Sequence, residues 1–144
     1  MNTLRASIKM PGDLFCGKAG VQTDIYVFEI GRPHEADDIV TFIDFSEDGY
    51  KRSARKKSDQ SVNLKDVDNA KARYAEVANI VLGKKTETSY YTEANGKVIK
   101  DSIGLNGDDW TFAQHIKTDT TVSDDDFAVA SREYTAYSFA SMLR

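Results

Sequence analysis

Apolar and polar residues alternate at the start of the chain. Every second residue from Leu4 to Met10 is apolar, which would place these side chains on one face of an extended backbone. This period of two predicts a β-strand, and Pro11-Gly12 predicts its end. Two further strands are predicted over 22–30 and 39–45, and both carry apolar residues on both faces. Strands of that kind are usually covered on both sides, which indicates a layered α/β sheet.

The second and third predicted strands are joined by a short connection. Only eight residues lie between Ile30 and Ile39, whereas a parallel crossover needs about a dozen or more. We therefore predict that these two strands run antiparallel.

Two helices are predicted in the second half of the chain. Apolar residues recur every three or four positions over 64–82, and Gly83 follows as a stop signal. The second helix is predicted to begin at a Ser123 cap, with three aspartates in its first turn that suit the helix dipole. The residues predicted to share one side of this second helix are Phe127, Ala130, Tyr134, Tyr137 and Met142.

A small β-hairpin is predicted between the two helices. Asn95-Gly96 separates two β-prone runs, 89–94 and 97–100. Both central residues of a type I′ turn need a positive φ, which Asn and Gly tolerate. The chain is therefore predicted to have an α/β fold, or an α+β fold as an isolated piece.

The composition indicates one domain with a core of its own. The chain has 144 residues, of which 40% are hydrophobic and 29% charged. No stretch approaches the ~20 apolar residues of a membrane span, and the N-terminus has no apolar block of a secretory signal, so no membrane contact is expected. The single cysteine, Cys16, cannot form an internal disulfide. These features predict a cytoplasmic protein.

No catalytic or metal-binding set stands out in the sequence. Gly17 and Gly20 lie in a loop that joins strand to strand, whereas phosphate-binding glycine loops lead into a helix. Cys16 has no histidine nearby in the sequence to activate it. His34 and His115 have no Cys or carboxylate partner at a metal-ligand spacing. We therefore predict no catalytic residue and no metal site.

Positive charge is concentrated in one short segment. Without the basic residues of 51–57, 14 basic residues face 23 acidic ones, so the net charge of −4 combines a −9 body with a +5 loop. Flexible basic segments contact the phosphates of DNA or RNA without reading sequence, and a merely solvated loop is the alternative. The residues predicted to bind nucleic acid are Lys51, Arg52, Arg55, Lys56 and Lys57.

Three stretches of the chain occur in a characteristic order. They are Leu-Arg-Ala-Ser-Ile-Lys-Met-Pro at 4–11 with Asp-Leu-Phe at 13–15, Gly-Val-Gln-Thr-Asp-Ile-Tyr-Val-Phe at 20–28, and Phe-Ile-Asp-Phe-Ser-Glu-Asp-Gly-Tyr-Lys-Arg at 42–52. This series resembles the later part of the N-6 adenine-specific DNA methyltransferases, above all the modification subunits of type I restriction-modification systems. Residues 108–110 and 121–127 are similar more loosely to C-terminal extensions in the same group.

The resemblance implies a place in a larger fold. These enzymes have a mostly parallel seven-stranded sheet that ends in an antiparallel hairpin. The three strands here would be its last three, with 39–45 between the other two. Residues 1–57 would then be the end of that sheet with the basic loop, and 58–144 a helical and hairpin extension packed on it in one compact unit.

The catalytic motifs of the family do not occur in this chain. The family binds its methyl donor, S-adenosylmethionine, through a Phe-x-Gly-x-Gly-like loop, and it holds the flipped adenine with an Asn-Pro-Pro-Phe/Tyr motif. The two prolines here, Pro11 and Pro33, are far apart. We therefore expect no cofactor in this chain and no activity of the chain alone.

The resemblance implies a fragment or domain that contributes contacts to DNA, to other methyltransferase segments or to restriction-modification subunits. A stand-alone, non-catalytic nucleic-acid-binding module that uses 51–57 is the alternative, and a decayed fragment without a role is a third possibility. In the implied sheet the backbone of residues 4–9 would form an open edge, which favours pairing with a second copy in a two-fold homodimer.

Overall fold

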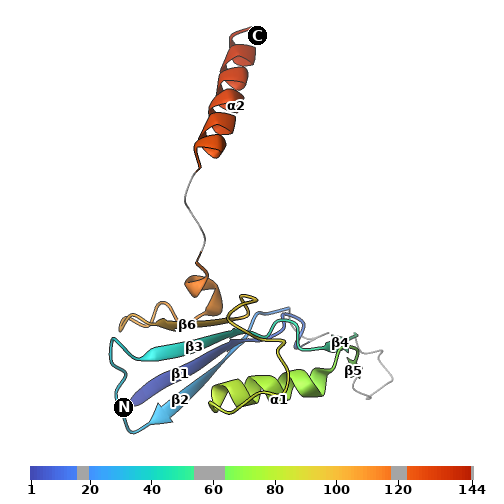
Figure 1. Ribbon diagram of the computed structural model, residues 1–144, viewed down its shortest axis with the longest axis vertical. Helices are drawn as coiled ribbons and strands as arrows, with labels where there is room; N and C mark the ends of the chain where they lie inside the picture. Colours follow the sequence, from blue (N-terminus) through green and yellow to red (C-terminus); the bar gives the residue numbers. More distant parts are fainter. Residues whose placement is uncertain (16–19, 54–63, 118–122, 144) are drawn as a thin grey trace.

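The computed structural model of the chain describes residues 1–15, 20–53, 64–117 and 123–143. A four-stranded mixed sheet is the largest element of the fold, and α1 (Ala70–Val81) lies against it (Figure 1). In spatial order its strands are β2 (Asp24–Ile30), β1 (Asn2–Lys9), β3 (Ile39–Asp44) and β6 (Val98–Ser102). The other elements are β4 (Tyr50–Arg52), β5 (Leu64–Asp66), α1 (Ala70–Val81), the 3-10 helix η1 (Phe112–His115) and α2 (Asp124–Met142). The predicted mixed α/β class is confirmed.

The order of the strands differs from the predicted order. β1 is a central strand, antiparallel to β2 and parallel to β3, while β3 pairs antiparallel with β6. β2 and β3 do run in opposite directions, but they are separated by β1. A short connection limits the direction of two strands without requiring that they be neighbours. The predicted placement of 39–45 between the other two strands, and the predicted open edge at residues 4–9, are therefore wrong.

A β-bulge in β1 changes which face its side chains occupy. The register between β1 and β2 shifts between Leu4 and Ala6, and an extra residue in a strand reverses the alternation beyond it. Leu4 accordingly packs on one face of the sheet, and Ile8 and Met10 pack on the other. The prediction that these residues share a face is wrong because alternation in the sequence does not reveal a bulge at Arg5.

Each face of the sheet has its own core. On one face Ile8, Ile43 and Phe45 pack with Val77 of α1. On the other face Val40 and Phe42 pack with segments that follow β6, including Ile103 and Phe112. Apolar side chains on both faces of β3 are thus buried, each set in its own core, as the sequence predicts.

The predicted hairpin around Asn95-Gly96 is wrong in part. A turn forms, with Gly96 at a φ of 74° and the backbone N–H groups of Thr92 and Lys97 donating to Asn95 Oδ1 at 3.1 and 3.0 Å. The run 89–94 does not become a strand. The N–H groups of Tyr90 and Tyr91 donate to the Glu76 carboxylate instead, and β6 pairs with β3.

Helix α1 begins later than predicted. Residues 64–66 form β5, which pairs with β4, and the chain then turns at Asn69 with a φ of 52°. The Asp66 side chain accepts the N–H of Ala70 at 3.0 Å and satisfies one donor at the start of the helix.

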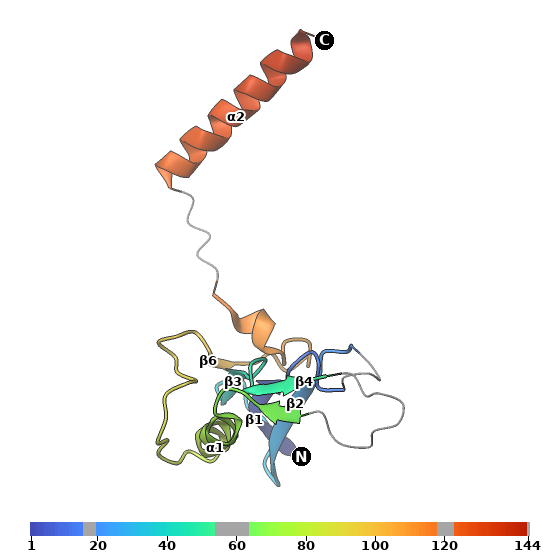
Figure 2. The same cartoon turned by 90° about the vertical axis from the view of Figure 1, so that its right-hand side faces the viewer.

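Helix α2 begins at the predicted Ser123 cap and extends to Met142. The Ser123 hydroxyl accepts a hydrogen bond from the backbone N–H of Asp126. The Asp126 carboxylate in turn accepts one from the backbone N–H of Ser123, which completes a capping box. None of the residues of α2 is buried, and both views show the helix apart from the sheet (Figures 1 and 2). Neither helix in the described ranges is long and apolar enough to cross a membrane.

Candidate functional site

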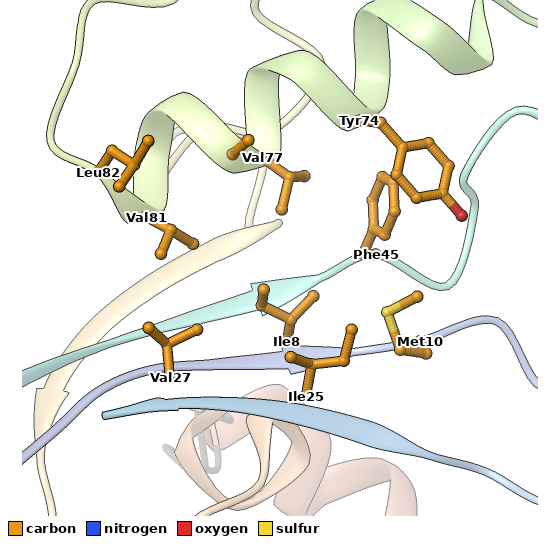
Figure 3. Close-up of a pocket in the computed structure, with 10 residues that line it drawn as sticks. Ile8, Met10, Ile25, Val27, Phe45, Tyr74, Val77, Val81 and Leu82 are labelled. Atoms are coloured by element: carbon orange, nitrogen blue, oxygen red, sulfur yellow. The ribbon is translucent and has the colours of Figure 1, made fainter. Parts of the chain in front are cut away.

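An apolar groove lies between α1 and the sheet (Figure 3). Its volume is about 280 Å³. Helix α1 forms one wall and strands β1, β2 and the end of β3 form the other. The residues that line it are Ile8, Met10, Ile25, Val27, Phe45, Tyr74, Val77, Ala78, Val81 and Leu82. All are apolar except for the hydroxyl of Tyr74, so the groove suits an apolar occupant.

The groove exists because one helix cannot cover the whole sheet. Four strands span about 14 Å between the outer strand axes, whereas a helix with its side chains is about 10–12 Å wide. Val77 packs over β1 and β3, and β2 at the edge is left uncovered. Ile25 on β2 is 47% exposed and Leu82 at the end of α1 is 65% exposed. These two residues mark the open side of the groove.

A buried ionic network holds one end of the groove. The Tyr74 hydroxyl donates to Asp48 at 2.7 Å, and the guanidinium of Arg52 forms an ion pair with the same carboxylate. Burial, followed by the hydrogen bond to Asp48 and the charge of that carboxylate, raises the pKa of Tyr74 to about 12. Tyr74 therefore stays neutral at ordinary pH and keeps its hydroxyl turned to the carboxylate.

The carboxylate of Asp48 is kept ionised by its partners. Its burial raises the pKa, but hydrogen bonds from Arg52, from Tyr74 and from the backbone of Tyr50 outweigh burial and bring the pKa below 3.8. A carboxyl group whose pKa is lower in the folded state stabilises the fold above its ordinary pKa, and that contribution is lost as the pH falls through the folded-state value.

We expect the stability of the chain to depend on Asp48 in acid. Below about pH 4 the free energy of unfolding should fall, and Asp48→Asn should reduce the difference between pH 7 and pH 3. Urea unfolding of both proteins at the two pH values measures this difference. Asp37→Asn, at an exposed position, is the control and should leave the difference unchanged. An equal loss of acid sensitivity in both variants would contradict the assignment to Asp48.

The residues predicted to bind nucleic acid are only partly described. Lys51 is exposed on β4. The Arg52 side chain is only 10% exposed and forms ion pairs with Asp48 and Asp13, so its charge is used inside the fold. Arg55, Lys56 and Lys57 lie outside the described residues. Nucleic-acid binding through 51–57 stays a prediction.

The histidines do not form a reactive set with other described side chains. The His115 ring is stacked on Phe42 at 3.9 Å and lies 2.9 Å from the Asp101 carboxylate, so it supports the core. His34 is partly buried in the turn before β3. In the described ranges no group of three or more His, Cys, Asp or Glu side chains is placed to hold a metal ion. Cys16, Gly17 and the rest of that loop up to residue 19 lie outside these ranges.

Comparisons with known proteins give no match to this chain. The chain matches no protein-family model, no curated protein and no solved structure. The resemblance to DNA methyltransferases therefore stays a prediction, and the central place of β1 differs from the strand order that the resemblance implies.

The groove is a feature that the sequence did not reveal. The helical spacing of Val77 and Val81 correctly indicates an apolar side of α1, and Ile25 and Val27 correctly indicate an apolar face of β2. No pattern in the sequence shows that these two surfaces lie side by side and remain unfilled. One sequence signal could indicate the groove. The strands are apolar on both faces, whereas a single short helix, α1, is available to cover one of these faces.

Proposed function

We propose that this chain is a non-catalytic protein-binding module whose groove receives apolar side chains of a protein segment. The single observation that carries this proposal is the apolar lining of an open groove beside an edge strand. Exposed apolar surface of this kind in a protein commonly marks an interaction site.

The size and chemistry of the groove favour side chains over a small polar ligand. A cavity of about 150 Å³ holds a benzene ring, so a groove of about 280 Å³ has room for one or two aromatic side chains. Sites for small molecules usually add a few polar groups that fix the orientation of the ligand. Here the Tyr74 hydroxyl supplies the one polar side-chain atom of the lining, and it already donates its hydrogen bond to Asp48.

Like the role in subunit contacts that the resemblance implies, this proposal concerns binding to another protein segment. It does not depend on the methyltransferase resemblance or on the basic segment, which remain separate proposals. A module of this kind needs only a rigid groove, and the buried contacts of Val77 with Ile8 and Ile43 supply that rigidity.

The proposal is tested by closing the groove from within α1. Ala78 and Ala75 are both exposed alanines of α1, but only Ala78 lines the groove. We expect Ala78→Glu to weaken binding of the neutral apolar dye Nile red by about tenfold, because a charge is costly in an apolar site. Ala75→Glu should leave the fluorescence titration unchanged. Equal titrations for the two variants would show that the dye, and hence apolar surface of a partner, does not use the groove.

A further inference from the structure

Helix α2 exposes a large amount of apolar surface. Its seven large apolar side chains, including that of Leu143 at its C-cap, are between 53% and 83% exposed. Most of the stability of helices in proteins comes from the packing of an apolar face against other elements rather than from helix propensity. Helix α2 therefore needs a surface to pack on. The described residues of its own chain do not provide one, because they bury none of the residues of α2.

One side of α2 has a regular apolar seam. Phe127, Ala130, Tyr134 and Tyr137 follow one another at spacings of three, four and three residues, which places them on one face of the helix. From Phe127 to Tyr137 the seam is about 15 Å long, and the α1 wall of the groove from Tyr74 to Leu82 is about 12 Å long. The seam is thus long enough to fill the groove.

Charges at the two surfaces are opposite in sign. Three aspartates, 124–126, form the first turn of α2. Lys84 and Lys85 follow Leu82, the C-cap of α1 at the open side of the groove, by two and three residues, and both are exposed. Neither lysine takes part in an ion pair between described residues. An α2 that lies antiparallel to α1 brings its aspartates to these lysines.

The connection to α2 is too short to reach the groove of the same chain. Lys117 and Ser123 are six Cα–Cα steps apart, which reach at most about 23 Å. The connection leaves from η1, whose Phe112 packs on the face opposite to α1. A path around a sheet edge crosses two layers of about 10 Å each and part of the sheet's width of about 14 Å. The groove of a second copy is not subject to this limit.

We infer that α2 of one copy occupies the groove of a second copy, and that the two chains exchange their α2 helices in a two-fold dimer. This inference rests on the proposed function and names the partner of the same groove. It places the aromatic seam of α2 against Ile25, Val27 and Leu82, and it pairs Asp124 and Asp125 with Lys84 and Lys85. The tethered exchange is reciprocal, so each dimer has two such contacts.

A charge exchange in the full chain tests the inference. Lys84→Glu/Lys85→Glu and Asp124→Lys/Asp125→Lys should each weaken the dimer at least about tenfold, because attraction becomes repulsion at both contacts. Asp126 and Ser123 are kept, so the capping box remains. An equimolar mixture of the two variants should regain the dimer, because both contacts are then attractive. Light scattering and sedimentation over a range of concentrations measure the dissociation constants.

Other outcomes would overturn the inference in distinguishable ways. The control Lys65→Glu/Lys71→Glu changes two exposed lysines, one on β5 and one in the first turn of α1, and should not weaken the dimer. A strictly monomeric wild-type chain, or a mixture that does not regain the dimer, would exclude exchange between copies. If Lys84→Glu/Lys85→Glu leaves the dimer unchanged but Tyr134→Ser/Tyr137→Ser abolishes it, then α2 pairs with α2 of the second copy and not with its groove.

The result separates the inference from the proposed function. If Ala78→Glu weakens Nile red binding and the charge exchange has no effect, the groove binds apolar groups but α2 is not its occupant. If Ala78→Glu has no effect on the dye even in the background of Lys84→Glu/Lys85→Glu, where α2 of a second copy no longer fills the groove, the proposed function fails.

Discussion

Glu76→Ala should lower the free energy of unfolding by about 3 kcal/mol or more. The side chain is 2% exposed, and its carboxylate accepts the N–H groups of Tyr90 at 3.0 Å and Tyr91 at 2.6 Å as well as the Thr88 hydroxyl. Removal of the carboxylate leaves donors in or near the core without an acceptor, and each unsatisfied buried donor costs about 1–3 kcal/mol. Urea unfolding followed by circular dichroism measures the loss.

Two further variants separate the lost acceptor from a general effect of substitution. Glu76→Gln keeps one acceptor oxygen and should cost about half as much as Glu76→Ala. Glu87→Ala changes an exposed glutamate in the same loop and should stay within about 0.5 kcal/mol of the wild type. If Glu76→Ala and Glu87→Ala proved equally mild, the carboxylate would not be what holds the loop 84–97 to α1.

Among the glycines that the structure describes, Gly49 should be the most damaging to replace by Ala, with a loss of about 3 kcal/mol or more. Gly49 has a φ of +84°, and an added Cβ would lie 2.5 Å from the carbonyl oxygen of Asp68 and 2.9 Å from Cα of Ala70. The left-handed conformation alone costs a non-glycine residue about 1–2 kcal/mol, and the close contacts are with backbone atoms that cannot swing away. Urea unfolding measures the loss.

Gly83→Ala is the matched control for Gly49→Ala. Gly83 also has a positive φ, of +67°, but nothing lies within 4 Å of an added Cβ. Its substitution should therefore cost only the conformational part, about 1 kcal/mol. Equal losses at the two positions would mean that the turn at Gly49 relaxes away from the start of α1, and the close approach would not matter for stability.

The sequence predicted the main elements well where local pattern decides. The strands predicted at 22–30 and 39–45 correspond to β2 and β3, and the second helix begins where its Ser123 cap indicates. These features depend on the periodicity and on the capping of a few neighbouring residues, so they can be derived without knowledge of the rest of the chain.

The sequence failed where a distant partner decides. The run 89–94 has strand-like residues, but the carboxylate of Glu76, 14 and 15 positions earlier, takes the N–H groups of Tyr90 and Tyr91. Arg5 is an ordinary polar residue of a strand in the sequence, yet the bulge beside it sends Leu4 and Ile8 into different cores. The strand order likewise depends on which edge of β1 receives β3, and connection length does not determine that choice.

The candidate site was missed for a related reason. A groove is the part of a surface that packing leaves unfilled, so its residues have the same pattern as core residues in the sequence. Leu82 and Ile25 would be assigned to the core from hydrophobicity alone, but they are exposed at the groove's open side. The basic segment drew attention because of its composition, and the structure shows that Arg52 is bound within the fold.

The central position of β1 has a consequence for how the chain is made. Of the four strands of this sheet β1 is synthesised first, but its parallel partner ends at Asp44, and the strand that closes the other side of β3 ends only at Ser102. Until these residues emerge, the most buried strand of the sheet has at most the β2 hairpin beside it. Such late pairing between distant segments slows folding and leaves apolar surface exposed in the meantime. The nascent chain is thus open to unwanted association through the strand that is best protected once the protein is complete.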